Sequence, residues 1–167
     1  MLFRSMPNLL TGTFAFQRTD AFQMQSAAIL MQMLGCVIAG TLADRFGAGR
    51  IMFWGSLCVA VISAIFYNSL GHVTPSTIFS LYMLLGLFSG TVGIVSYSMV
   101  KMFPAQIRFS GISFSYNVAY AIAGGLTLPL VQWLSLYSDI GAMYYIVVLC
   151  CFTLLTSLIY RKKFEIH

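Results

Sequence analysis

Hydrophobic and polar residues follow one another along this chain in long blocks. Stretches without Lys, Arg, Asp or Glu cover residues 21–43, 51–100, 109–138 and 140–160. A crossing of a hydrocarbon core about 30 Å thick takes about 20 mostly apolar residues. The second stretch is long enough for two crossings, and it divides at GHVTPS, residues 71–76, where glycine, histidine and proline predict a turn.

This pattern predicts an all-α membrane protein with five transmembrane helices, at about residues 22–43, 51–70, 77–99, 110–136 and 141–160. The apolar runs are too long for barrel strands and lack their period of two. We therefore expect a five-helix bundle over residues 22–160, preceded by a separate segment at 1–21. A basic cytoplasmic tail is expected at 161–167.

The composition agrees with a membrane location and limits the chemistry. The chain is 59% hydrophobic and 8% charged, whereas soluble domains are about 25% charged. Its four cysteines all lie in apolar runs, which predicts small buried side chains. Neither the cysteines nor the histidines have metal-ligand spacing, so we expect no metal site and no cofactor. The sequence also lacks the polar cluster that a membrane enzyme needs, so an enzyme is not expected.

Basic residues occur on alternate connections between the predicted helices. Seven of the nine Lys and Arg residues fall at 44–50, at 101–108 and in the tail, and the connections at 71–76 and 137–140 carry none. The positive-inside rule then predicts a multi-pass protein of the cell (inner) membrane with a cytoplasmic C-terminus. The bilayer is the expected partner of the chain. Nucleic acid is not, because the basic residues do not form a face with stacking aromatics.

The first cytoplasmic connection contains a compact motif. Gly40, Asp44, Arg45 and Gly47 stand in the pattern G-x-x-x-D-R-x-G, and Arg50 follows. We expect Gly40 to allow close approach of two helices near the membrane face. Asp44 is an anion among cations, and it could pair with a basic residue or cap the next helix. A simpler interpretation is that these charges only anchor the helix ends.

A second motif follows the third predicted helix. Residues 103–125 read FPAQIRFSGISFSYNVAYAIAGG, with the pattern F-P-x-x-x-R-x-S-G, then Y-N and then G-G. We expect Pro104 to stop one helix, and Arg108, shortly before Gly111, to anchor the next. The first motif resembles the signature loop of the major facilitator superfamily. The second resembles its metabolite–proton symporters, a branch with transporters for proline and betaine, shikimate, 2-oxoglutarate and citrate.

The resemblance implies both a place in a larger fold and a function. The five spans would correspond to helices 8–12 of a twelve-helix transporter, and residues 1–21 to the outer end of helix 7 and the loop after it. The implied function is that of the C-terminal part of a secondary-active transporter, which moves a small organic metabolite or osmolyte with a proton.

The resemblance covers less than half of such a transporter. It therefore implies a truncated or split gene, and no transport or proton coupling unless an N-terminal half completes the protein. The alternative is a small membrane protein that binds or regulates another membrane protein. Such a protein would bury the small-residue face around Gly86 and Gly90 in its partner, whereas plain helix packing is the simpler interpretation of that face.

Polar residues inside the spans indicate where a solute would bind, because such residues usually face a cavity or another helix. In the span 110–136 they recur at helical spacing. The resemblance also implies that several of these spans line a central cavity. The substrate-cavity candidates are Gln32, Tyr97, Tyr116, Asn117 and Tyr120. The solute itself stays open between osmolytes, dicarboxylates and aromatic acids.

Overall fold

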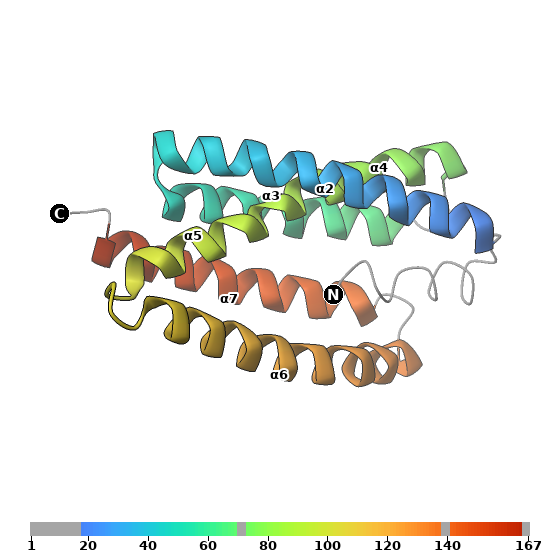
Figure 1. The fold of residues 1–167 in the computed structure, drawn as a ribbon. Helices are drawn as coiled ribbons and strands as arrows, with labels where there is room; N and C mark the ends of the chain where they lie inside the picture. Colours follow the sequence, from blue (N-terminus) through green and yellow to red (C-terminus); the bar gives the residue numbers. More distant parts are fainter. Residues whose placement is uncertain (1–17, 70–72, 138–140, 165–167) are drawn as a thin grey trace.

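The computed structural model describes residues 18–69, 73–137 and 141–164, and these residues form helices with no strand (Figure 1). In chain order the elements are α2 (Arg18–Phe46), α3 (Ala48–Ser69), α4 (Pro75–Ser89), the 3-10 turn η1 (Gly90–Val92), α5 (Gly93–Met102), α6 (Arg108–Tyr137) and α7 (Gly141–Phe164). Within these residues five helical segments are long and apolar enough to cross a membrane, and α4, η1 and α5 together make the third. The predicted all-α class and the five predicted spans are confirmed.

The helices lie side by side along a common direction (Figure 1). The closest packing joins α2 to α4 and α3 to α7. At the opposite edge α6 packs mainly on α7, where the hydroxyls of Thr127 and Tyr145 share a hydrogen bond of 2.7 Å. The bundle therefore has a tightly packed side, made by α2, α3 and α4, and a looser edge at α6.

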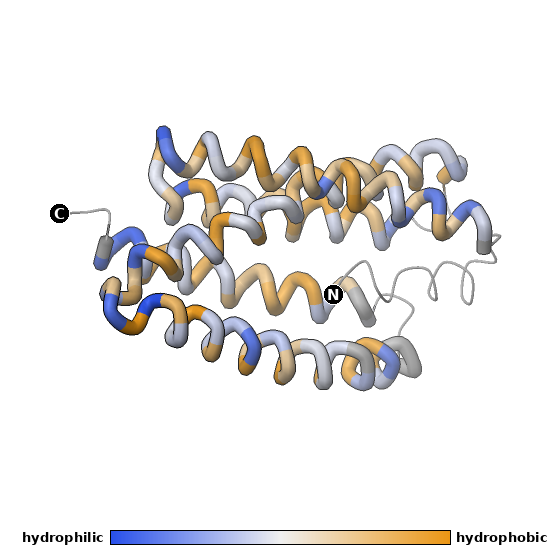
Figure 2. Tube along the Cα trace, viewed as in Figure 1, coloured by the Kyte–Doolittle hydropathy of each residue, from blue (hydrophilic) through white to orange (hydrophobic). Residues whose placement is uncertain are grey.

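Most large apolar side chains of the bundle point outward. Val37 is 67% exposed, Phe114 72% and Ile159 67%, and orange apolar positions run along every helix in Figure 2. The buried share of each span ranges from 12% for Arg108–Leu134 to 33% for Pro75–Met102. An apolar surface of this extent would drive association in water, whereas lipid chains can cover it. The exposed surface thus supports a multi-pass membrane protein.

Two apolar clusters hold the helices together. The larger one joins α2, α3, α4, α6 and α7, and in it the rings of Phe66 and Tyr82 stack with centroids 5.6 Å apart. The smaller cluster lies where α2 passes into α3, and there Tyr160 of α7 and Ile94 of α5 pack against three alanines. Both clusters use side chains from at least four elements, so they fix how the spans are arranged.

Glycines allow α2 and α4 to pack almost backbone to backbone. A Cβ atom built on Gly35 would lie 2.0 Å from the carbonyl oxygen of Leu87, and one on Gly90 would lie 2.4 Å from the carbonyl carbon of Gly35. A Cβ on Gly86 would lie 2.5 Å from the carbonyl oxygen of Ala28. The small-residue face of α4 is thus an internal packing face. The simpler interpretation of this face, plain helix packing, is confirmed, because α2 of the same chain occupies the face that the alternative would bury in a partner.

The hydropathy of the third span predicted one continuous α-helix, but the structure divides it into α4, η1 and α5. It narrows to the 3-10 turn η1 between Gly90 and Val92. Just before and within this turn, Ser89 Oγ donates to the Gly86 carbonyl (2.7 Å) and Thr91 Oγ1 donates to the Phe88 carbonyl (3.0 Å). Such side-chain bonds to the backbone compete with regular helix bonds, and glycine lowers helix propensity further. A hydropathy average measures only how apolar a segment is. It therefore detects neither the side-chain hydrogen bonds nor the low helix propensity of glycine.

The helix ends differ from the predicted ones in two places. The first span begins at Arg18 instead of 22, and the last continues to Phe164, so the basic residues at 161–163 form helical turns and not a separate tail. Hydropathy reports the apolar part of a helix, and both helices extend past it with polar turns. Most of the segment predicted at 1–21, and the residues after 164, lie outside the described residues.

Candidate solute site

A cavity of about 270 Å³ lies between α2, α3, the α4–η1–α5 span and α7. We call it the Gln32 pocket, because the Gln32 amide is the largest polar group on its wall. Its other lining residues are mostly small or apolar: Met52, Ser56, Val59, Ser89, Thr91, Val92, Val95, Cys150 and Thr153. None of these lining residues carries a charge. The pocket therefore offers hydrogen bonds to a solute without an ionic partner.

The hydroxyls on the pocket wall are fixed by bonds to their own helices. Ser56 Oγ donates to the Phe53 carbonyl at 3.0 Å, and Thr153 Oγ1 to the Leu149 carbonyl at 3.0 Å. Ser89 and Thr91 do the same within α4 and η1. A hydroxyl has one proton and two lone pairs, so each of these oxygens still accepts hydrogen bonds. The Gln32 amide both donates and accepts, which makes it the most versatile group in the pocket.

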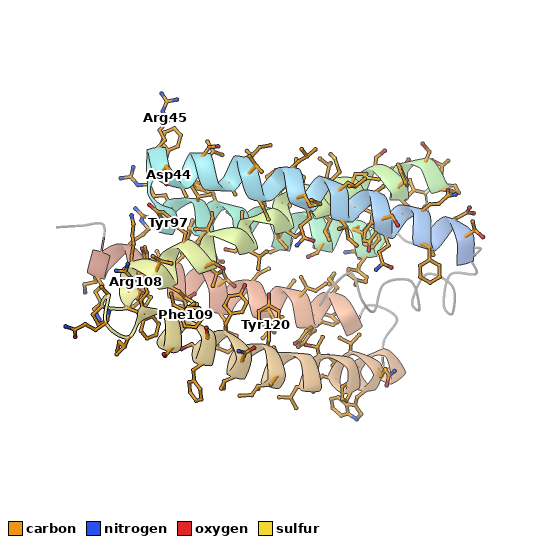
Figure 3. All side chains as sticks on the ribbon, in the orientation of Figure 1. Asp44, Arg45, Tyr97, Arg108, Phe109 and Tyr120 are labelled. Carbon is orange, nitrogen blue, oxygen red and sulfur yellow. The ribbon has the colours of Figure 1, made fainter. Side chains whose placement is uncertain are left out.

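A pair of tyrosines stands on α6. Tyr116 and Tyr120 lie one helical turn apart, with ring centroids at 4.7 Å, an angle of 20° between the rings and hydroxyl oxygens at 3.4 Å. In Figure 3 Tyr120 stands on the side of α6 toward the other helices, and half of its surface (50%) is exposed. Asn117, between them in sequence, is also exposed. This part of α6 presents aromatic faces, hydroxyls and an amide.

Tyr97 lies elsewhere, near the end of the bundle that carries Asp44 and Arg108 (Figure 3). The ammonium of Lys101 sits 4.5 Å from the centroid of its ring, which is a cation–π contact. The structure thus brings Tyr116 and Tyr120 together and leaves Gln32 and Tyr97 in two other places. Helical spacing could not reveal the hydroxyls that share the pocket with Gln32, because they come from different helices.

The first motif forms a tight reversal between α2 and α3. Gly47 has φ of 94°, a conformation that L side chains rarely adopt, and its N–H donates to the Ala43 carbonyl at 3.0 Å. Asp44 lies at the same end of the bundle as Tyr97 of α5 (Figure 3). The expectation for Gly40 is wrong, because a Cβ atom built there meets no heavy atom of the described residues within 4 Å. The close approach occurs at Gly35, more than a helical turn earlier.

The second motif builds the connection from α5 to α6. α5 ends at Met102, and Phe103 is extended, as expected for a residue before proline. The Nε of Arg108 donates to the Phe103 carbonyl at 3.2 Å. A Cβ on Gly111 would lie 2.6 Å from the Phe103 ring, so only glycine leaves room for that ring. The predicted helix stop before Pro104 is confirmed, and Arg108 acts locally by closing this turn.

Comparison with known proteins identifies relatives that are solute transporters. No family model matches the chain, and no solved structure is significantly similar to it. The chain is 28% identical to the inner membrane metabolite transport protein YhjE of Escherichia coli over 128 residues, which is 75% of this chain and 29% of the relative. It is 28% identical to the proline/betaine transporter of Salmonella typhimurium over 163 residues (95% and 32%).

A third relative is the alpha-ketoglutarate permease of Escherichia coli, 29% identical over 168 residues, which is 95% of this chain and 37% of that protein. The chain thus spans about a third of the length of the curated relatives it matches. The resemblance predicted from the two motifs is confirmed, and this chain is homologous to a part of larger metabolite and proline/betaine transporters of the major facilitator type.

Proposed function

We propose that this chain supplies part of a secondary transporter for small polar organic solutes and that the Gln32 pocket holds part of the solute path. The observation that carries the proposal is a neutral, hydrogen-bonding cavity among apolar spans, in a chain whose relatives are solute transporters. Polar groups inside a span are costly unless they serve a partner or a cavity. Gln32 meets this condition. Tyr116, Asn117 and Tyr120 form a separate polar patch on α6, which is a second part of the proposed path.

The chemistry of the pocket favours a solute without net charge. Relatives are named for proline and betaine and for alpha-ketoglutarate. A dicarboxylate brings two negative charges, and the lining residues offer no cation to pair with them. A zwitterion such as proline or betaine brings its own counter-charge and needs no ionic partner from the pocket wall. We therefore assign this chain to the transport of zwitterionic solutes.

The proposal includes a membrane, an orientation and a driving ion. The basic ends of α2, α5 and α7 face the cytoplasm of the cell (inner) membrane, because positive residues are retained there. Asp44 pairs with a basic residue of these ends in one transport state and separates from it in another. The solute moves with a proton, and the rest of the transporter supplies the titrating groups.

Equilibrium binding to the purified full chain in lipid nanodiscs tests this proposal. Radiolabelled proline and glycine betaine should bind saturably, and 2-oxoglutarate should not. Gln32→Ala should weaken that binding about fivefold, because one hydrogen bond contributes roughly 1 kcal/mol. Cys151→Ser, at an exposed position of α7 outside the pocket, is the matched control and should leave the affinity unchanged. Preferred binding of 2-oxoglutarate, or equal affinities for parent and Gln32→Ala, would contradict the assignment.

A further inference from the structure

A second cavity, of about 290 Å³, lies on the outer surface of the bundle between α2, α3 and the junction of α4 with η1. We call it the apolar groove. Ile38 and Leu42 of α2 and Ile51 and Trp54 of α3 form its walls. The groove opens to the outside, since Trp54 is 61% exposed and Ile38 50%. It is separate from the Gln32 pocket, and the two share only Thr91 among their lining residues.

Two glycines let the helices behind the groove pack closely. Gly35 and Gly55 approach α4 and η1 so closely that a Cβ on either would lie within 2.3 Å of a neighbouring atom. The hydroxyl of Thr91, the polar side chain on the wall, donates to the Phe88 carbonyl. A polar solute would find almost no partner here. The groove instead lies among three membrane-spanning segments, which lipid acyl chains would surround in a bilayer.

One end of the groove is positively charged. Arg45 follows Leu42 by one helical turn on α2, and Arg50 precedes Trp54 by one turn on α3, so both arginines continue the walls of the groove. Both are exposed, and Arg45 points away from the bundle at the end of α2 (Figure 3). Two guanidinium groups are thus available for a phosphate at the membrane surface.

We propose that the apolar groove binds an acyl chain of an anionic phospholipid, whose phosphate is held by Arg45 and Arg50. The apolar wall selects a hydrocarbon chain, and the arginines select a negatively charged headgroup. Trp54 stands between these two parts, which is where tryptophan is enriched in membrane proteins. The proposal does not depend on the solute, because it uses no group that the Gln32 pocket offers for hydrogen bonding.

Tryptophan quenching by brominated lipid tests this proposal in a bilayer. The chain has two tryptophans, Trp54 at the groove and Trp133 on α6, which is 55% exposed. The full chain with Trp133→Phe, reconstituted in phosphatidylcholine, therefore reports on the groove alone. Dibromo-phosphatidylglycerol should quench Trp54 more strongly than the same fraction of dibromo-phosphatidylcholine. In the Trp54→Phe chain, the two lipids should quench Trp133 equally.

Charge variants identify the headgroup site. The double variant R45Q/R50Q in the Trp133→Phe chain should lower the preference for phosphatidylglycerol, by roughly fivefold for each arginine. The double variant K162Q/K163Q removes two exposed cations of α7 and should retain the preference. Equal quenching of Trp54 by both lipids overturns the proposal. So does a preference that survives R45Q/R50Q or that falls as far in K162Q/K163Q. Equal helicity of all variants by circular dichroism shows that folding is unchanged.

Discussion

Single glycines set the distance between α2 and α4. Gly35, Gly86 and Gly90 each lie so close to backbone atoms of the facing helix that no Cβ fits. Backbone atoms cannot move aside as a flexible side chain can, so a methyl group at these positions must separate the helices. In lipid, helices associate through such close packing and not through the hydrophobic effect. These glycines are therefore essential to the α2–α4 contact.

Gly90→Ala should lower the free energy of unfolding by about 1–3 kcal/mol, as overpacking does in other tightly packed cores. Gly40→Ala is the matched control on α2, because a Cβ there has no heavy atom within 4 Å in the described part of the chain. It should leave stability unchanged or raise it by up to about 1 kcal/mol, since alanine favours helix. Thermal unfolding in detergent, followed by circular dichroism, measures both. A Gly90→Ala chain as stable as the Gly40→Ala chain would contradict the packing.

Gly47→Ala tests the reversal between α2 and α3. With φ of 94°, an alanine at this position is strained by about 1–2 kcal/mol. We expect a corresponding drop in unfolding free energy in the same thermal assay. Gly125→Ala on α6 serves as the control, because among the described residues no heavy atom lies within 4 Å of a Cβ at this helical position. Equal stabilities of the two variants would show that the chain reverses without a left-handed residue.

At the scale of elements, the five spans could be predicted from the sequence, but the 3-10 turn that interrupts the third span could not. Charge-free blocks predicted five helices because a membrane requires long apolar segments. The turn η1 depends instead on local bonds of Ser89 and Thr91, and on helix contacts that only the fold creates. Gln32 could be predicted as a site residue, because an amide in a span is unusual. Its companions Ser56 and Thr153 could not, since a lone hydroxyl in an apolar helix has many uses.

The same elements predict a sidedness that labelling can measure. Thr74 precedes α4, Lys162 lies in the last turn of α7, and both are exposed. The third, fourth and fifth spans lie between these two positions, and an odd number of crossings should place them on opposite sides of the membrane. In a chain whose four native cysteines are replaced by alanine, Thr74→Cys should react with an impermeant maleimide on intact cells. Lys162→Cys should react only after the cells are opened.

Labelling of both positions from the same side would contradict the number of crossings between them. The opposite pattern, with Lys162→Cys labelled on intact cells, would leave the spans in place and show that the cytoplasmic orientation is wrong. The double variant Thr74→Cys/Lys162→Cys is the control for expression, because it carries both labelling sites in one molecule. It is labelled once on intact cells and once after the cells are opened.

At the scale of the whole molecule, the bundle places a neutral pocket inside and an apolar surface outside. The pocket draws on four of the five spans, while α6 lies at the edge and carries the tyrosine pair. The chain spans about a third of its relatives, so a complete solute path includes surfaces from other parts of such a transporter. The open edge at α6, with half of Tyr120 exposed, is suited to face those surfaces.

The most direct test is uptake by a chimaera in which this chain replaces the similar segment of the Salmonella typhimurium proline/betaine transporter. In cells without other proline and betaine transporters, we expect uptake of radiolabelled proline or glycine betaine above the empty-vector level. Gln32→Ala should reduce this uptake, and Cys151→Ser should not. A chimaera that reaches the membrane at the parental level and takes up neither solute would contradict the proposed function.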